Sequence, residues 1–173
     1  MTEPPGIERV LFTEEQVDQR IREVAAEISA KYQGRDLKLI AVLKGAVFFL
    51  TALARAIEIP LKIDFLAISS FGSGGPGMVR IAKDLDHPIQ DEDILLVEDI
   101  VDTGRTLNRL MDLLRARNPR SLEICALLHK HIAEELKYDT KFVGFDAPHE
   151  FLVGYGLDHA ESFRHIPYIA SLL

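Results

Sequence analysis

The sequence predicts an α/β fold in which helices flank a central, mostly parallel sheet. Two observations predict this fold. Apolar runs at residues 37–43, 94–97 and 122–128 show little alternation of polar with apolar residues, as strands buried on both faces do. Stretches with helical spacing separate these runs, which is the order that parallel strands require. Since no repeat or long linker divides the 173 residues, we expect a single domain over residues 1–173.

The first helix has the clearest local signal. A short apolar segment at residues 7–12 precedes Thr13, which has the side chain of a helix N-cap, and Gln16 three residues later completes a capping box. The apolar residues that follow are spaced for one face of a helix, which we expect to end near Gly34. These residues are Val17, Ile21, Val24 and Ile28.

The rest of the chain alternates between strand-like and helix-like stretches. The expected helices span residues 45–57 and 104–116. The expected strands span residues 37–43, 61–71, 78–82, 93–98, 122–128, 142–145 and 151–155. Ligands of such sheets bind beyond the carboxyl ends of the strands, so the first places to look for chemistry follow Leu43, Val97 and Leu128.

Composition limits the classes of function. The chain is 47% hydrophobic and 27% charged, as soluble globular proteins are. Its net charge of -7 argues against a nucleic-acid surface. No secretion signal opens the chain and no apolar run approaches the roughly 18 residues of a membrane span. The single Cys125 lies in an apolar strand and is expected to be a core thiol, so we expect a cytoplasmic protein with no membrane partner.

Two adjacent carboxylates, Glu98 and Asp99, end a predicted strand. Burying them there is costly unless a cation or hydroxyl groups meet them. Since neighbouring strand residues point to opposite faces, the pair would not chelate one ion side by side. The loop that follows, residues 102–106, offers backbone N–H groups, two threonine hydroxyls and a helix N-terminus, which together make an anion site. Gly104 lets the backbone approach the anion closely.

An anion site beside carboxylates indicates a phosphorylated sugar as ligand. The amides would hold the phosphate, and the carboxylates would hold ribose hydroxyls or a hydrated Mg²⁺. The structural alternative is a strand, a turn and an N-capped helix with surface acids, in which Asp102 or Thr103 is the cap. These residues alone leave both interpretations open.

The segment from Leu95 to Leu107 resembles the phosphoribosyl-pyrophosphate motif of the type I phosphoribosyltransferases. Residues 97–104, Val-Glu-Asp-Ile-Val-Asp-Thr-Gly, are most similar to the hypoxanthine-guanine branch, and the resemblance runs from about Glu8 to the C-terminus. It implies the fold of that family, with a small hood formed by the N- and C-terminal segments. It also implies a homodimer or homotetramer and Mg²⁺-dependent purine salvage, with phosphoribosyl pyrophosphate and a 6-oxopurine base, hypoxanthine or guanine, as substrates.

The resemblance implies a role for each residue of the motif. Glu98 and Asp99 contact the ribose hydroxyls and magnesium-bound water, so they are the implied magnesium-binding residues. Asp102 faces N7 of the purine as proton acceptor and is the catalytic residue. The residues that surround the 5′-phosphate are Thr103, Gly104, Arg105 and Thr106.

Two lysines outside the motif match as well. Lys44 and Gly45 stand in the pyrophosphate-binding loop, where the family often has a cis peptide before the lysine. Lys130 donates to the 6-oxo group and so favours oxopurines over adenine, because the wrong base leaves a buried donor unpaired. Without the resemblance, Lys44 would be a surface lysine at an ordinary turn and Lys130 a solvated one.

The C-terminal part of the chain supplies the other implied contacts. Phe151 stacks on the purine, and the backbone of Leu152 contacts its edge; leucine here replaces the commoner valine, which a backbone contact tolerates. Asp158 binds a second magnesium, and Arg164 binds pyrophosphate. Without the resemblance, Phe151 would pack in the core, and Asp158 and Arg164 would be surface residues.

The glycine-rich segment at residues 72–77 contains a literal G-x-G-x-x-G. We reject a dinucleotide-binding loop, because Pro76 lies inside it and residues 78–82 have the composition of a strand rather than a helix. The resemblance makes Ser70, Phe71 and this segment a lid over the reaction. Phe71 stands where tyrosine is usual and lacks the hydroxyl.

Three rival functions remain. An RNA-binding pyrimidine-operon regulator of the same fold would need a basic face, which the net charge of -7 argues against. A transferase with another base preference is nearer; Lys130 argues against adenine, while the ranking of hypoxanthine, guanine and xanthine is open. A sugar-phosphate binding module would bind without releasing pyrophosphate.

Overall fold

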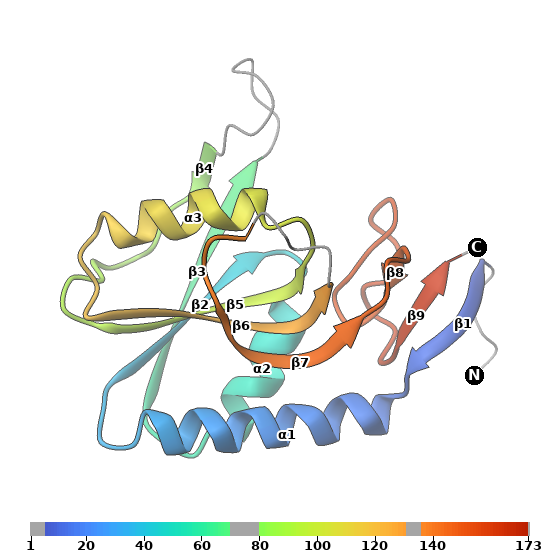
Figure 1. Cartoon of the computed structure of the whole chain (residues 1–173), viewed down its shortest axis with the longest axis horizontal. Coiled ribbons are helices and arrows are strands. Elements are labelled where there is room, and N and C mark those ends of the chain that lie inside the picture. The colour runs from blue at the N-terminus through green and yellow to red at the C-terminus, as the bar shows by residue number, and fades with distance from the viewer. Residues whose placement is uncertain (1–5, 70–79, 131–135, 173) are drawn as a thin grey trace.

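A computed structural model describes residues 6–69, 80–130 and 136–172. Within them, six strands form the central sheet in the order β4-β3-β2-β5-β6-β7 (Figure 1). All neighbours pair parallel except the edge strand β4, which is antiparallel to β3. The predicted α/β fold with a mostly parallel sheet is therefore confirmed. The strands are β2 (Leu37–Leu43), β3 (Leu61–Ser69), β4 (Arg80–Lys83), β5 (Asp93–Val101), β6 (Ser121–Lys130) and β7 (Thr140–Ala147).

Helices cover both faces of this sheet. Helices α1 (Glu14–Lys31) and α2 (Val47–Ala56) pack on one face and α3 (Arg105–Arg115) on the other (Figure 1). Alternate residues of one strand serve the two cores, since Leu95 packs with α1 and α2 whereas Leu96 packs with α3. This double burial explains the continuous apolar runs of the sequence.

Helix α1 begins as predicted and ends earlier. The Thr13 side chain accepts a hydrogen bond from the Gln16 N–H, and the Gln16 side chain accepts one from the Thr13 N–H, so the capping box is confirmed. The helix ends at Lys31 rather than near Gly34. Gly34 has a φ of 76° and lies in the turn that leads to β2.

The two ends of the chain form the expected hood beside the end of β7 (Figure 1). Strands β1 (Ile7–Phe12), β9 (Ile169–Leu172) and β8 (Leu152–Val153) pair antiparallel in the order β1-β9-β8. The strand predicted over residues 151–155 is thus shorter and belongs to the hood. The positive φ angles from Gly154 to Gly156 end it. The sequence did not predict β9.

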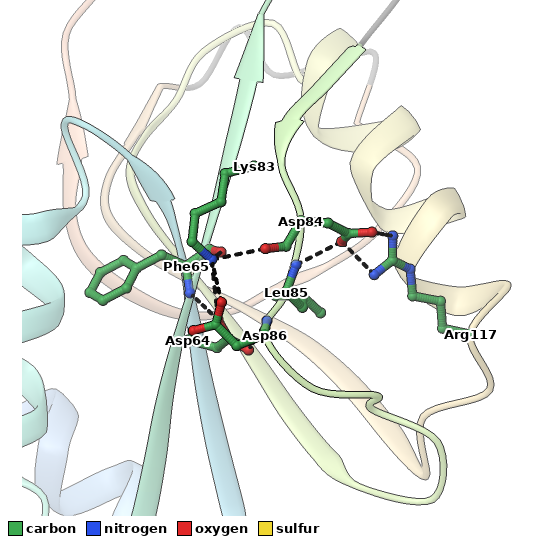
Figure 2. A network of polar contacts seen from close by, with 7 residues as sticks. All are labelled: Asp64, Phe65, Lys83, Asp84, Leu85, Asp86 and Arg117. Atoms are coloured by element: carbon green, nitrogen blue, oxygen red, sulfur yellow. Dashed lines mark hydrogen bonds and ion pairs between the residues drawn. The ribbon is translucent and has the colours of Figure 1, made fainter.

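A polar network fastens the edge strand β4 to the sheet (Figure 2). The buried Asp64 carboxylate on β3 accepts hydrogen bonds from the N–H groups of Phe65 and Asp86. The Lys83 ammonium donates to the Phe65 carbonyl and to the Asp86 carboxylate. Arg117, beyond α3, holds Asp84 with two hydrogen bonds of 2.7 and 3.0 Å.

No helix in the described part of the chain is long and apolar enough to cross a membrane.

Candidate active site

The parallel register brings the predicted site residues to the end of the sheet at which the parallel strands terminate. Val97 of β5 is level with Ala41 of β2 and Cys125 of β6, so the residues after these positions emerge together. A cavity of about 200 Å³ opens there. Its walls are the last residues of β5, the loop to the start of α3, and two side chains from β2 and β3. The lining residues are Val42, Ile68, Glu98 and residues 100–107.

The loop between β5 and α3 leaves the start of α3 free of a side-chain cap. The N-cap position falls on Gly104, so the alternative in which Asp102 or Thr103 caps the helix is wrong. Gly104 has a φ of 86°, and a Cβ there would lie 2.9 Å from the backbone of Leu136, so this position needs glycine. Asp102, Thr103, Arg105 and Thr106 are exposed around the buried glycine. The helix N-terminus can therefore meet an anion.

The Lys130 ammonium lies beside Asp102, one of the residues that line the cavity. The Lys130 ammonium lies 3.7 Å from the Asp102 carboxylate, with 11% of the lysine side chain and 54% of the aspartate side chain exposed. Lys130 is the last residue of β6, which continues two residues past the predicted end, because it still pairs with Ala147 of β7. A solvated lysine, the alternative interpretation, is thus wrong.

The carboxylates of Glu98 and Asp99 lie near the end of β5. Burial raises the pKa of Glu98 well above its usual range, and the neighbouring Asp99 charge adds to the shift. Burial also raises the pKa of Asp99, against the hydrogen bond that its carboxylate accepts from the Ile100 N–H at 2.8 Å. Asp158 is close enough to raise that pKa further. The Arg164 guanidinium acts in the opposite direction and lowers the pKa of Asp99.

The turn from β2 to α2 packs directly against the Asp99 carboxylate. The peptide bond between Leu43 and Lys44 is cis, as the resemblance implied. A Cβ on Gly45 would overlap the Asp99 carboxylate, and a Cβ on Gly156 would overlap the Gly45 carbonyl. Both glycines are therefore required by the close approach of three chain segments.

Residues 154–164 fold back over this turn. The Arg164 guanidinium pairs with the Asp158 carboxylate at 2.8 Å and donates to the Gly156 carbonyl at 2.8 Å. The Lys44 ammonium pairs with Glu161 at 2.8 Å. The structure thus brings Lys44, Asp158 and Arg164 together, as the resemblance implied. It adds Glu161, which no motif in the sequence singled out.

Phe151 and Leu152 lie at the start of the hood, where the chain enters β8. Phe151 is 55% exposed and its ring meets the His159 ring edge-on at 5.3 Å between centroids. Core packing, the alternative interpretation of this residue, is therefore wrong. Leu152 is buried and pairs with Ser171 of β9.

The described residues include neither the predicted lid nor a ready-made cluster of metal ligands. Ser70, Phe71 and residues 72–77, the predicted lid, lie outside them. In the part of the chain that the structure describes, no three His, Cys, Asp or Glu side chains gather as a ready-made metal site. Two larger surface hollows lie elsewhere, one between α1 and α2 and one beside the start of β6.

Comparison with known proteins agrees with this geometry. The family described as "Phosphoribosyl transferase domain" matches residues 11–160. The hypoxanthine-guanine phosphoribosyltransferase of Mycobacterium avium is 50% identical over 98% of this chain and 87% of its own length. The crystal structure of a hypoxanthine-guanine phosphoribosyltransferase from Bacillus anthracis superposes with a TM-score of 0.91 and 38% identity, over 97% of this chain and 98% of that one. A hypoxanthine phosphoribosyl transferase of Trypanosoma cruzi superposes with a TM-score of 0.93 and 36% identity, over 100% and 95% of the two chains. The chain belongs to the phosphoribosyltransferase family.

Proposed function

We propose that this chain is a purine-salvage enzyme that transfers the 5-phosphoribosyl group from phosphoribosyl pyrophosphate to N9 of hypoxanthine or guanine. The products are IMP or GMP and pyrophosphate. One observation supports the proposal: the exposed loop before α3, two carboxylates with raised pKa values and the mostly buried Lys130 lie at the carboxyl ends of the parallel strands in a chain of this family.

Each part of the sugar donor has candidate contacts in the site: the 5′-phosphate, the ribose and the pyrophosphate. The exposed residues around Gly104 and the uncapped start of α3 suit the 5′-phosphate. Glu98 and Asp99 suit the ribose hydroxyls, since carboxylates accept hydrogen bonds from hydroxyl groups. Lys44 and Arg164 suit the pyrophosphate. These assignments place the bond that breaks between the phosphate loop and the turn after β2.

The base has a recognition pair in Asp102 and Lys130. N7 and O6 are neighbours on one edge of a 6-oxopurine, and the two side chains lie 3.7 Å apart. Lys130 would donate to O6, while Asp102 would accept the proton at N7. Phe151 is exposed and free to stack on the ring, with the backbone of Leu152 at the edge of the base.

Magnesium fits the carboxylates at this edge. Mg²⁺ binds proteins through one or two carboxylates together with substrate phosphates and water, so it does not need a dedicated cluster of ligands. Glu98 and Asp99 have raised pKa values because they are buried beside negative charge, which is the environment a cation relieves. Asp158 is near enough to Asp99 to share in a second site. Bound Mg²⁺ would neutralise pyrophosphate charge.

The proposed reaction is a single displacement. The N9–C1′ bond forms as the bond from C1′ to pyrophosphate breaks, and Asp102 takes the proton that the purine loses. Positive charge develops on the ribose above Glu98 and Asp99, so those carboxylates stabilise the transition state electrostatically. Lys44 and Arg164 neutralise the leaving group. The remaining catalysis comes from holding donor and base in line.

A spectrophotometric assay with phosphoribosyl pyrophosphate, Mg²⁺ and each base in turn tests the proposal. We expect turnover with hypoxanthine or guanine and little with adenine. Turnover with none of the oxopurines would refute the proposed function. Binding of phosphoribosyl pyrophosphate without turnover would favour the rival binding module.

We also propose a cytoplasmic homodimer or homotetramer. Membership of the phosphoribosyltransferase family supports association of subunits, and one similar solved structure comes from a study of the oligomeric state of the Trypanosoma cruzi enzyme. Light scattering of the purified chain gives the mass directly, and a mass of 19.4 kDa, that of one chain, would contradict the proposal.

A further inference from the structure

Glu161 reaches both cations that the proposed function assigns to pyrophosphate. Its carboxylate lies 2.8 Å from the Lys44 ammonium and 3.7 Å from the Arg164 guanidinium. Lys44 follows β2 and Arg164 lies near the C-terminus, so Glu161 joins two distant segments of the chain. A single carboxylate therefore stands between the two positive groups.

The backbone, rather than the glutamate side chain, sets this position. Ala160 and Glu161 have φ angles of 49° and 64°, in the left-handed region that residues with a Cβ seldom adopt. The Glu161 N–H donates to the Asp158 carboxylate at 2.9 Å. Asp158 in turn holds Arg164 at 2.8 Å. The segment is thus folded so that the carboxylate turns toward Lys44.

The Glu161 pair with Lys44 is also easy to exchange. The side chains of Glu161 and Lys44 are each 67% exposed. Exposed ion pairs in water are weak, so a more highly charged anion displaces the carboxylate readily. Pyrophosphate carries several negative charges, whereas the glutamate carries one.

We propose that Glu161 is a positioning residue that acts through Lys44 and Arg164, as an internal anion that competes with pyrophosphate for them. The inference rests on the proposed function, since it takes these two cations as the pyrophosphate contacts. When pyrophosphate is bound, Lys44 turns from Glu161 to the ligand. When the bond to C1′ has broken, Glu161 takes the cations back and speeds release of the product.

The test compares the full chain with Glu161→Gln, which keeps the size of the side chain and removes its charge. Calorimetry measures the dissociation constant of inorganic pyrophosphate in the presence of Mg²⁺. We expect pyrophosphate to bind about 1.5- to fivefold more tightly to the variant, the range in which an exposed carboxylate competes. KM for phosphoribosyl pyrophosphate should fall by a larger factor than kcat changes.

Three controls separate competition from a loss of structure. IMP has no pyrophosphate, so its dissociation constant should stay unchanged in Glu161→Gln. Glu27→Gln removes another exposed carboxylate, which pairs with Arg20 at 3.5 Å, and should leave pyrophosphate binding unchanged. Glu161→Ala should tighten pyrophosphate binding like the glutamine variant, while Glu161→Asp, which keeps a carboxylate, should lie closer to the wild type.

Two results would overturn the inference. One is pyrophosphate binding that is unchanged or weaker in Glu161→Gln. The other is an equal change in IMP binding, which would indicate a structural role. If the wild-type chain neither bound pyrophosphate nor turned over, the proposed function itself would fail. A variant that turns over with unchanged pyrophosphate binding refutes only the role of Glu161.

Discussion

Asp102 is the residue on which the proposed chemistry depends most. It is exposed in the loop after β5, and the ammonium of Lys130 lies 3.7 Å away. Because Gly104 takes the N-cap position, Asp102 has no structural duty at the helix start. Its carboxylate is therefore available to the base.

Replacing Asp102 with asparagine tests this role. The change keeps the size of the side chain and removes its ability to accept a proton, so we expect kcat to fall by about 10²- to 10⁴-fold. Steady-state kinetics with hypoxanthine measures the loss, and an unchanged melting temperature shows that the fold persists. A variant with full turnover would remove Asp102 from the mechanism.

Lys130 is expected to decide which purine is used. In Lys130→Met the donor to O6 is gone, so kcat/KM for hypoxanthine should fall by roughly 10- to 100-fold, the value of one charged hydrogen bond. Adenine has no 6-oxo group and should lose far less. The measurement is the ratio of kcat/KM for the two bases. An unchanged ratio would show that another group reads position 6.

At the scale of elements, the attachment of β4 to the sheet can be tested by measuring the free energy of unfolding, independently of the enzymatic reaction. Asp64 is 4% exposed and accepts hydrogen bonds from two backbone N–H groups, with Lys83 within 3.8 Å (Figure 2). In Asp64→Ala both N–H groups lose their acceptor, and we expect the free energy of unfolding to fall by about 2 kcal/mol.

Urea denaturation measures this loss. Asp86→Ala is the matched control, because its exposed side chain pairs with the same Lys83 and exposed pairs contribute about 0–1 kcal/mol. Equal losses in the two variants would show that burial of Asp64 has no part in holding the edge strand.

Elements differ in how well the sequence predicts them, for physical reasons. The strands β2, β5 and β6 were predictable because two cores bury their central residues, which form apolar runs. Strand β9 is four residues long and its partners are β1, at the other end of the chain, and β8. No local pattern signals such a pairing. The ends of β5 and β6 were placed too early, since polar residues interrupt the apolar runs there although the strands continue to pair with their neighbours.

The residues of the site also differ in how well the sequence predicts them. Lys44, Lys130 and Arg164 were predicted from a family resemblance, because motifs retain the residue types that the chemistry needs. Glu161 was not, since its position depends on left-handed backbone angles that neither Ala160 nor Glu161 signals by its type. Sequence patterns indicate residues with regular geometry better than those that an irregular loop positions.

At the scale of the whole molecule, charge and architecture act together. The chain carries a net charge of -7, yet its sheet edge collects Lys44, Lys130 and Arg164, each paired with a carboxylate of its own. A site of this kind stays close to neutral until an anionic substrate arrives. The hood is built from the N- and C-terminal strands, and the exposed Phe151, the proposed stacking residue, lies where it begins.

The stoichiometry of turnover tests the central claim most directly. Purified chain is incubated with phosphoribosyl pyrophosphate, Mg²⁺ and hypoxanthine, and pyrophosphate, base and nucleotide are quantified from one reaction. The account predicts one pyrophosphate released and one IMP formed for each hypoxanthine consumed, and neither product when the base is omitted. Pyrophosphate release that does not depend on the base, or a complete absence of IMP, would contradict it.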